Sequence, residues 1–234
     1  MSFIKTFKEA VCSGYILQNR ELIEKNNILA LENDRLKTIP IANINPEDYW
    51  NNLYTKSHVT YEIRPGKIID IRAMQAVSLE TELEMRKIAQ QWEGKNPDDI
   101  ALSVLKYVIS KLTYKSDNGE YWQTIDETWK LKTGDCEDGM NLLCALLRFT
   151  GISAWRRECY AGDVKINEFP KLTGHAFIVY IANDNKEYVL DWCFYPNESI
   201  INFKKKPLSE LERYEDSWFS YNEQYAWKSR DFKK

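Results

Sequence analysis

Hydrophobic residues follow a seven-residue period along the first part of the chain. Between residues 7 and 37 there is no proline, and Leu22, Leu29 and Leu36 occupy every seventh position. Glutamate, lysine and arginine flank the repeat, and an asparagine series shares its period: Asn19, Asn26 and Asn33. Such a pattern is typical of coiled coils. We therefore expect residues 1–38 to form an N-terminal coiled-coil helix that makes the protein a homo-oligomer.

Two heptad registers fit this repeat. With the leucines at the d positions the asparagines fall at a, which favours a parallel dimer. With Ile16, Ile23 and Ala30 at a, the asparagines fall at d, and a trimer is also compatible. The repeat covers only about four heptads, so a single amphipathic helix lying on the chain's own globular domain is the alternative to both.

The pattern changes after residue 38. Residues 39–77 contain Pro40, Pro46 and the pair Pro65-Gly66, so we expect an irregular connecting region with two short strands, at residues 60–63 and 68–71. The remainder, residues 78–234, is predicted to be the main globular domain.

Three helices are predicted in the first half of this domain. One covers residues 78–92, and a second begins near Pro97 with Asn96 as its cap. Apolar residues of the second helix recur at helical spacing, at Ile100, Val104, Val108 and Leu112. The third helix runs over residues 136–149 and stops at Thr150-Gly151, where glycine can adopt the left-handed cap.

Strand patterns follow these helices. We expect strands at residues 152–160, 175–181 and 187–193, the last two forming a hairpin around residues 182–186. The aromatic tail, residues 218–227, is expected to pack back onto the domain. A helix followed by antiparallel strands indicates an α+β fold.

Composition narrows the possible functions. The net charge of −3 makes nucleic acid an improbable partner. No apolar stretch reaches the roughly 20 residues of a membrane span, and the N-terminus does not resemble a secretory signal. Five scattered cysteines without a CxxC pair indicate free thiols in a reducing compartment, so we expect a cytoplasmic protein with no metal and no cofactor.

The segment around Cys136 is the first candidate for chemistry. A thiol has a pKa of about 8.5, and a helix N-terminus favours its ionisation because unpaired N–H groups point at it. The same N–H groups can hold an oxyanion. The neighbours Asp135, Glu137 and Asp138 oppose ionisation, so a cationic partner is needed. We expect the remaining thiols of this domain, Cys144, Cys159 and Cys193, to be small buried apolar residues.

His175 and Asp191 are candidates for that partner and for the residue that orients it. His175 stands at the start of one hairpin strand and Asp191 near the end of the next. An odd loop centred on Asn183 would put the two side chains opposite each other on one face. An even loop, such as a two-residue turn at residues 184–185, would put them on opposite faces unless a bulge intervenes.

Several blocks of the chain resemble the transglutaminase-like superfamily, especially the bacterial transglutaminase-like cysteine proteinases. The blocks are residues 121–129, Gly134-Asp135-Cys136-Glu137-Asp138, residues 142–148, Gly151-Ile152-Ser153-Ala154, Gly174-His175-Ala176-Phe177 and Leu190-Asp191-Trp192. They lie in the family's order of Cys, His and Asp and cover roughly residues 78–196. The sequence departs from the family at Gly139, where an aromatic residue is common, and at Met140, where a small residue is frequent.

The resemblance implies a papain-like core in which the cysteine helix packs on an antiparallel sheet. It implies Cys136 as the nucleophile, His175 as the general base and Asp191 as the residue that orients the base. Trp122 and Gln123, in the polar run before the cysteine, are candidates for the substrate cleft or the oxyanion site.

The function expected from these residues is thiol-dependent acyl transfer on a peptide or glutamine-type amide. Hydrolysis, as in a cysteine peptidase or amidase, is favoured because the blocks resemble the proteinase branch. Protein cross-linking by a transglutaminase reaction is the alternative. A non-catalytic oligomeric assembly or binding protein on the same scaffold is a third interpretation, suggested by the N-terminal repeat.

Overall fold

The described residues all lie in the second of two units into which the chain divides, Tyr54–Lys234. A computed structural model describes residues 60–64, 67–70, 73–117, 121–166 and 172–230. The helix predicted over residues 1–38 lies outside these ranges, so it stays a prediction, as do the boundaries near residues 38 and 77. Within the described ranges, none of the helices combines the length and apolar character needed to cross a bilayer.

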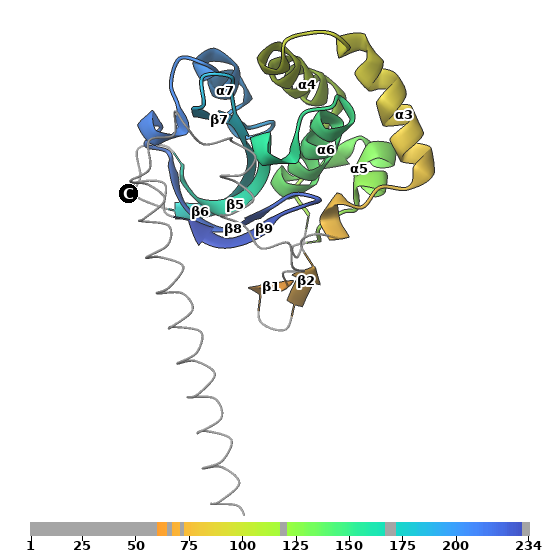
Figure 1. Ribbon diagram of the computed structural model, residues 1–234. Helices are drawn as coiled ribbons and strands as arrows, with labels where there is room; N and C mark the ends of the chain where they lie inside the picture. Colours follow the sequence, from red (N-terminus) through yellow and green to blue (C-terminus); the bar gives the residue numbers. More distant parts are fainter. Residues whose placement is uncertain (1–59, 65–66, 71–72, 118–120, 167–171, 231–234) are drawn as a thin grey trace, which may run out of the picture. The chain divides into compact units, whose positions relative to one another are not determined.

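Helices and strands alternate in a mixed arrangement (Figure 1). The α-helices of the described part are α3 (Leu79–Ala89), α4 (Pro97–Lys111), α5 (Ile125–Leu131), α6 (Cys136–Phe149) and α7 (Pro196–Asn202). Its strands are β1 (Thr60–Arg64), β2 (Lys67–Asp70), β3 (Thr113–Tyr114), β4 (Thr133–Gly134), β5 (Arg157–Lys165), β6 (Leu172–Ile181), β7 (Glu187–Leu190), β8 (Tyr214–Tyr221) and β9 (Ala226–Arg230). The strands predicted near residues 60 and 68 are thus present, as the antiparallel pair β1–β2.

Local signals at the helix ends account for the helix boundaries. The Ser78 hydroxyl accepts a hydrogen bond from the N–H of Thr81 at the start of α3, and the Asn96 side chain accepts one from Asp98 N–H at the start of α4. At the other end of the cysteine helix α6, Gly151 has a φ of 86°, in the region that favours glycine. The helices predicted at these places are confirmed.

Helix α6 forms the centre of the core. It packs against α3, α4 and α5 and against strands β5 and β6 of the main sheet. Most of its side chains are buried, including Met140, Leu143 and Leu147. A helix surrounded on all sides is held in place by its neighbours. Its first residue, Cys136, is therefore placed by the whole core.

The main sheet has the strand order β7-β6-β5-β8-β9, and every pair in it is antiparallel. The expected α+β fold with a cysteine helix on an antiparallel sheet is therefore correct. The aromatic tail packs onto the domain as expected, since it supplies β8 and β9, and Phe219, Tyr221 and Tyr225 are buried.

The strand predicted over residues 152–160 begins later than expected. Residues 154–156 form a short 3-10 helix, and β5 starts at Arg157. The amide of Asn222 donates hydrogen bonds of 2.9 Å to the carbonyl oxygens of Ala154 and Arg157. Because Asn222 lies 65 residues or more away in sequence, local pattern does not reveal this constraint.

The hairpin of β6 and β7 has an odd loop, but its centre is Asp184 and not Asn183. Ile181 pairs with Glu187 and Ile178 with Leu190, so continuing the register would place residue 193 opposite His175. Asn185 closes the loop with a φ of 60°. The predicted strand over residues 187–193 ends at Leu190, because the Asp191 carboxylate accepts the N–H groups of Cys193 and Phe194 and turns the chain.

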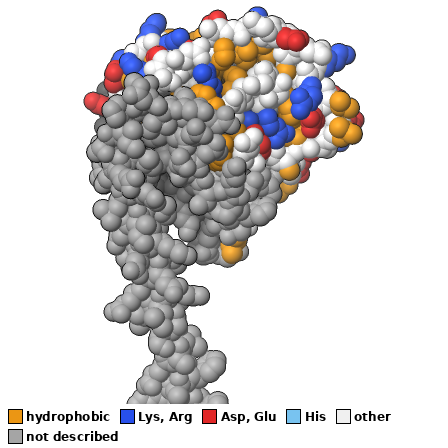
Figure 2. Space-filling view, viewed as in Figure 1, with side chains coloured by type: hydrophobic (Ala, Val, Ile, Leu, Met, Phe, Trp, Pro, Cys, Tyr) orange, Lys and Arg blue, Asp and Glu red, His pale blue; other side chains and the backbone are white. Residues whose placement is uncertain are grey.

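Charged side chains are spread over the surface. On the face shown in Figure 2, Lys and Arg side chains are interspersed with Asp and Glu over the described part. The described part of this face therefore shows no extended patch of one sign, in keeping with the small net charge of −3.

Candidate active site

The first turn of α6 is built by the residues that precede and follow Cys136. Asp138 accepts hydrogen bonds from the backbone N–H groups of Asp135 (3.2 Å) and Gln123 (2.8 Å). Gly134 permits this, since a Cβ at that position would lie 2.5 Å from the Cβ of Asp138. Asp138 thus ties the segment before α5 to the start of the cysteine helix.

The Cys136 thiol is held in its protonated form. Burial is the main cause that raises its pKa well above the ordinary value, and the charge of Glu137 adds to it. The thiol donates a hydrogen bond of 3.1 Å to Oε2 of Glu137. The acidic neighbours therefore oppose ionisation of the thiol, as expected, and ionisation at neutral pH requires a base.

Three carboxyl groups gather beside the thiol. The carboxylates of Asp135, Glu137 and Asp138 offer oxygen atoms within 4.8 Å of one another. Burial, followed by the charge of Asp135, raises the pKa of Glu137 to about 9 and that of Asp138 to about 7. Like charges at this spacing are neutralised by protons or by a cation. These three residues are thus one set in the described part of the chain that could hold a divalent cation.

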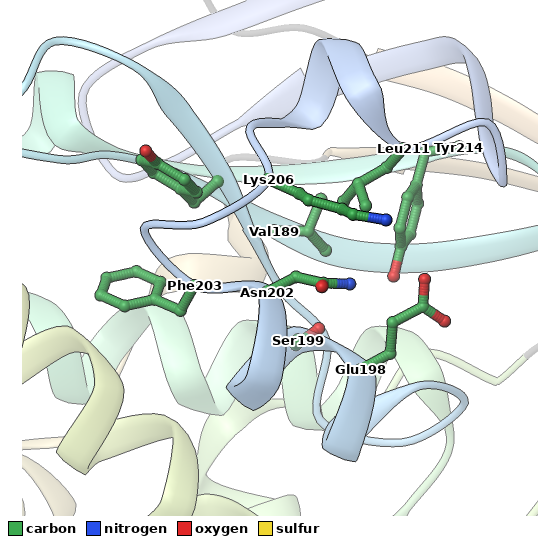
Figure 3. Close-up of a pocket in the computed structure, with 9 residues that line it drawn as sticks. Val189, Glu198, Ser199, Asn202, Phe203, Lys206, Leu211 and Tyr214 are labelled. Carbon is green, nitrogen blue, oxygen red and sulfur yellow. The ribbon is translucent and has the colours of Figure 1, made fainter.

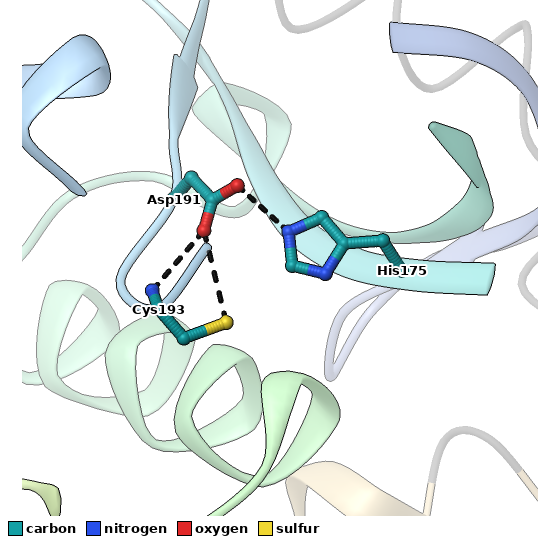
Figure 4. Close-up of side chains that lie close together, drawn as sticks. All are labelled: His175, Asp191 and Cys193. Atoms are coloured by element: carbon teal, nitrogen blue, oxygen red, sulfur yellow. Dashed lines mark hydrogen bonds and ion pairs between the residues drawn. The ribbon is translucent and has the colours of Figure 1, made fainter. Parts of the chain in front are cut away.

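His175 and Asp191 form a buried pair (Figure 4). Nε2 of His175 lies 2.7 Å from Oδ2 of Asp191, and both side chains are fully buried. Nδ1 of His175 has no hydrogen-bond partner among the described residues. Because Asp191 occupies Nε2, the imidazole presents Nδ1 as its free nitrogen.

Asp191 is fixed from several sides. Its N–H donates to Oγ of Ser199 (3.0 Å), and its Oδ2 accepts the hydroxyl of Tyr214 (3.1 Å). Ser199 and Tyr214 also line a cavity of about 10 Å³, which is drawn in Figure 3 and is too small for more than one water molecule. The side chains behind Asp191 are thus closely packed, as support for a fixed carboxylate requires.

The charge of His175 and several hydrogen bonds favour the ionised form of Asp191. Burial alone would raise its pKa, but the His175 charge and the hydrogen bonds from His175, from Cys193 N–H and from Tyr214 lower the pKa below the usual range. Cys193 adds a sulfur to the group, since donor atoms of His175, Asp191 and Cys193 lie within 4.8 Å of one another. Each Asp191 oxygen already accepts at least two hydrogen bonds, so hydrogen bonding accounts for this cluster without a metal ion.

Cys136 and His175 line the same cavity, whose volume is about 380 Å³. Aromatic and acidic side chains line much of it, together with the hydroxyl residues Ser116 and Thr173. The remaining lining residues include Tyr114, Asp117, Trp122, Asp135, Glu137, Phe194, Trp218 and Phe219. Trp218 lies against Gly174, where a Cβ would be 2.6 Å from the indole ring. A cavity of this size accommodates a few side chains of a peptide.

Trp122 and Gln123, the two candidates for the substrate cleft or the oxyanion site, differ in position. Trp122 lines the cavity, and its buried Nε1 has no partner among the described residues. Gln123 is not among the lining residues, and its side-chain oxygen accepts a hydrogen bond of 3.3 Å from the hydroxyl of Thr128. Trp122 thus remains a candidate for substrate contact, whereas the amide of Gln123 supports the adjacent helix.

The expectation for the other cysteines holds for two of them. Cys144 and Cys159 are fully buried in the core. Cys193 differs, because it is partly exposed and its sulfur lies 3.8 Å from Oδ1 of Asp191. Cys193 lies two residues after Asp191, where the chain turns sharply. This position was the signal in the sequence that distinguishes Cys193 from the two core cysteines, and we missed it.

Comparison with known proteins identifies the fold family. Residues 86–190 match the model of the transglutaminase-like superfamily. This segment belongs to the transglutaminase-like superfamily. The match contains Cys136 and His175 and ends one residue before Asp191. The family expected from the sequence blocks is therefore confirmed for this transglutaminase-like segment. No curated protein sequence matches the chain.

Solved structures of similar shape include bacterial proteins. LapG of Legionella pneumophila is 18% identical, with a TM-score of 0.45 over 63% of this chain and 87% of LapG. Its calcium-bound form is 20% identical, with a TM-score of 0.41 over 63% of this chain and 87% of that protein. A proposed cysteine protease from Cytophaga hutchinsonii is 17% identical, with a TM-score of 0.41 over 56% of this chain and 44% of its own.

Proposed function

We propose that this protein is a thiol-dependent acyl-transfer enzyme in which Cys136 is the nucleophile, His175 the base and Asp191 the residue that orients the base. One observation carries the proposal. Asp191 binds Nε2 of His175, which leaves Nδ1 unpaired beside a cavity that Cys136 also lines. A nucleophile, a base and an orienting group in this order are what thiol catalysis requires.

The chemistry begins with a proton transfer. Cys136 gives its proton to Nδ1 of His175, and Asp191 stabilises the resulting imidazolium. The thiolate then attacks the carbonyl carbon of a bound amide. The N–H groups at the start of α6 stabilise the oxyanion, and the unpaired N–H of Trp122 is a further donor.

The tetrahedral intermediate collapses when the C–N bond breaks. The imidazolium supplies the proton that the leaving amine needs, and an acyl-thioester remains on Cys136. Water or a second amine then attacks this ester and regenerates the thiol. Water gives a peptidase or amidase, and an amine gives cross-linking. We favour hydrolysis of a protein or peptide, because the sequence blocks resemble the proteinase branch.

The cysteines are compatible with this chemistry. The four in the described part, Cys136, Cys144, Cys159 and Cys193, are all free thiols. A free nucleophilic thiol persists in a reducing compartment.

Alkylation of Cys136 tests the proposal. In the wild-type protein, iodoacetamide should label Cys136 rapidly at pH 7, because the neighbouring imidazole accepts the thiol proton. His175→Ala should slow the labelling by about a hundredfold, the range found when a general base is removed. Cys136→Ala identifies the labelled position by mass spectrometry, and Cys159→Ser serves as a control at a buried thiol outside the cavity.

The opposite result has a definite meaning. If Cys136 of the wild type labels slowly, and the rate is the same in His175→Ala, the protein is not a thiol enzyme of this kind. The non-catalytic assembly or binding protein would then be the better interpretation.

A further inference from the structure

The chain segment that follows β7 contacts both halves of the proposed site. We call residues 191–194 the post-β7 segment. Asp191 binds the imidazole of His175, Trp192 binds the backbone of Cys136, and Phe194 stacks on the His175 ring. One short segment thus touches the start of the thiol helix and the imidazole of the strand that packs on it.

Trp192 is seated against the first turn of α6. Its Nε1–H donates a hydrogen bond of 3.0 Å to the carbonyl oxygen of Cys136, and the side chain is 3% exposed. Gly139 makes room for the indole, since a Cβ there would lie 2.1 Å from Cε2 of Trp192. The aromatic ring at this place comes from the post-β7 segment, so position 139 must stay without a side chain.

Phe194 is stacked flat on the imidazole. The ring centroids of His175 and Phe194 lie 4.3 Å apart, and the ring planes differ by 2°. Asp191 fixes this arrangement, because its Oδ1 accepts the N–H of Phe194 at 3.2 Å. An aromatic face at this distance limits rotation of the imidazole and attracts it more strongly when it is positively charged.

We propose that Trp192 and Phe194 are positioning residues, which hold the Cys136 end of α6 and the His175 ring in the relative placement that proton transfer requires. The inference rests on the proposed function. Proton transfer depends on donor and acceptor lying within hydrogen-bond reach, so a small displacement lowers the rate steeply. A segment bonded to both partners limits that displacement.

Other groups around the imidazole also influence its charge. Among the described residues, the titratable groups that contact it or line the same cavity are Tyr114, Asp117, Asp135, Cys136, Glu137, Asp191, Cys193, Tyr195 and Tyr214. Substitutions at residues 192 and 194 leave all of these in place, so a change in the pH profile reports on the substituted ring.

Trp192 is tested by removing one hydrogen bond. Trp192→Phe keeps an aromatic ring but lacks the N–H, and it should slow the iodoacetamide labelling of Cys136 at pH 7 roughly tenfold. Trp92→Phe is the matched control, because Trp92 is equally buried and lies on another part of the core. Trp92→Phe should label as fast as the wild type.

A double-mutant cycle separates positioning from general loss of stability. Gly139→Ala should slow labelling in the wild type and have little effect in Trp192→Ala, because the three atoms nearest to the new methyl group all belong to the indole. Equal effects of Gly139→Ala in both backgrounds would contradict the role of Trp192. Thermal unfolding of each variant shows whether it is folded at the temperature of the assay.

Phe194 is tested by the pH profile. Phe194→Leu should move the rise of the labelling rate to lower pH by about 0.5–1 unit, because the imidazolium loses its aromatic contact and releases its proton more readily. Phe194→Tyr should restore the wild-type profile, and Phe203→Leu is a control at an aromatic residue remote from His175.

The outcomes distinguish this inference from the function on which it rests. If the wild type labels slowly and independently of His175, the proposed function fails. If the wild type labels rapidly and depends on His175, but Trp192→Phe and Phe194→Leu match it in rate and profile, the function stands and the positioning role is wrong.

Discussion

At the scale of single residues, Asp191 shows how a buried charge is maintained. Its side chain is inaccessible to solvent, which by itself favours the neutral acid, yet the charge of His175 and the hydrogen bonds from His175, Cys193 N–H and Tyr214 keep the carboxylate ionised. A neutral acid at this place would no longer stabilise an imidazolium. The stability of the fold and the proposed chemistry therefore depend on the same charge.

The pH dependence of stability tests this charge. Because the pKa of Asp191 is lower in the folded protein, the carboxylate stabilises the fold above the ordinary pKa of about 3.9, and this contribution is lost as the pH falls below it. Asp191→Asn should lower the free energy of unfolding at pH 7 by about 1–3 kcal/mol. The difference from the wild type should shrink towards pH 3.

Urea titrations at several pH values measure this difference. Asp99→Asn, at an exposed position in the first turn of α4, is the control and should change the stability little. A difference between Asp191→Asn and the wild type that is as large at pH 3 as at pH 7 would show that the charge is not its cause.

Glu137 has the opposite effect. Its pKa of about 9 lies above the value of an unfolded chain, so the folded state binds a proton that the unfolded state has released. Stability should therefore fall as the pH rises from about 5 to 9, by up to about 1.4 kcal/mol per pH unit for one proton. Glu137→Gln should flatten this dependence and be more stable than the wild type at pH 8.

Urea titrations at several pH values also measure the pH dependence of stability for Glu137→Gln. EDTA is present so that no divalent cation competes with protons for the carboxyl groups of Asp135, Glu137 and Asp138. Glu80→Gln, at an exposed position on α3, provides the comparison. Parallel curves for Glu137→Gln and the wild type would contradict a raised pKa at Glu137.

At the scale of elements, the cysteine helix and the hairpin differ in how far local sequence predicts them. Both ends of α6 follow from local signals, the acidic first turn at Asp135 and the glycine at residue 151. The hairpin is less determined, because Asn183, Asp184 and Asn185 are all suited to turns. The left-handed conformation of Asn185 is what fixes the loop centre at Asp184.

Substitution of Asn185 tests the loop. Asn185→Gly should change the free energy of unfolding by only a few tenths of a kcal/mol, because glycine accepts a positive φ. Asn185→Val should cost about 1–2 kcal/mol, because a β-branched side chain clashes with the backbone there. Chemical denaturation measures both, and equal stability of the two variants would contradict a left-handed residue at this position.

At the scale of the whole molecule, the described unit combines a helical cluster with a sheet whose last two strands come from the end of the chain. Strands β8 and β9 complete the sheet and bring Trp218 to the cavity and Tyr214 to Asp191. The family match ends at residue 190, so these contributions lie beyond it. Residues after the match therefore help to shape the cavity.

The heptad pattern over residues 1–38 predicts an oligomer. The full chain should elute as a dimer or trimer in size-exclusion chromatography with light scattering, and a chain beginning at residue 39 should be a monomer. Replacing Leu29 with aspartate in the full chain should also give monomers, because it puts a charge into the repeat. A monomeric full chain would favour an amphipathic helix that packs on its own domain.

By itself, the sequence determined what depends on near neighbours in the chain. Local signals or short motifs specify the caps of α3 and α4, both ends of α6, the presence of the hairpin though not its loop centre, and the family blocks around Cys136, His175 and Asp191. Tertiary structure decided what depends on distant residues. The start of β5 is set by Asn222, the space for Trp192 by Gly139, and the stack of Phe194 on His175 by the turn at Asp191. These contacts join segments that lie far apart in the sequence and meet only when the chain packs. Packing of this kind leaves no periodic pattern of residues in the sequence from which it could be predicted.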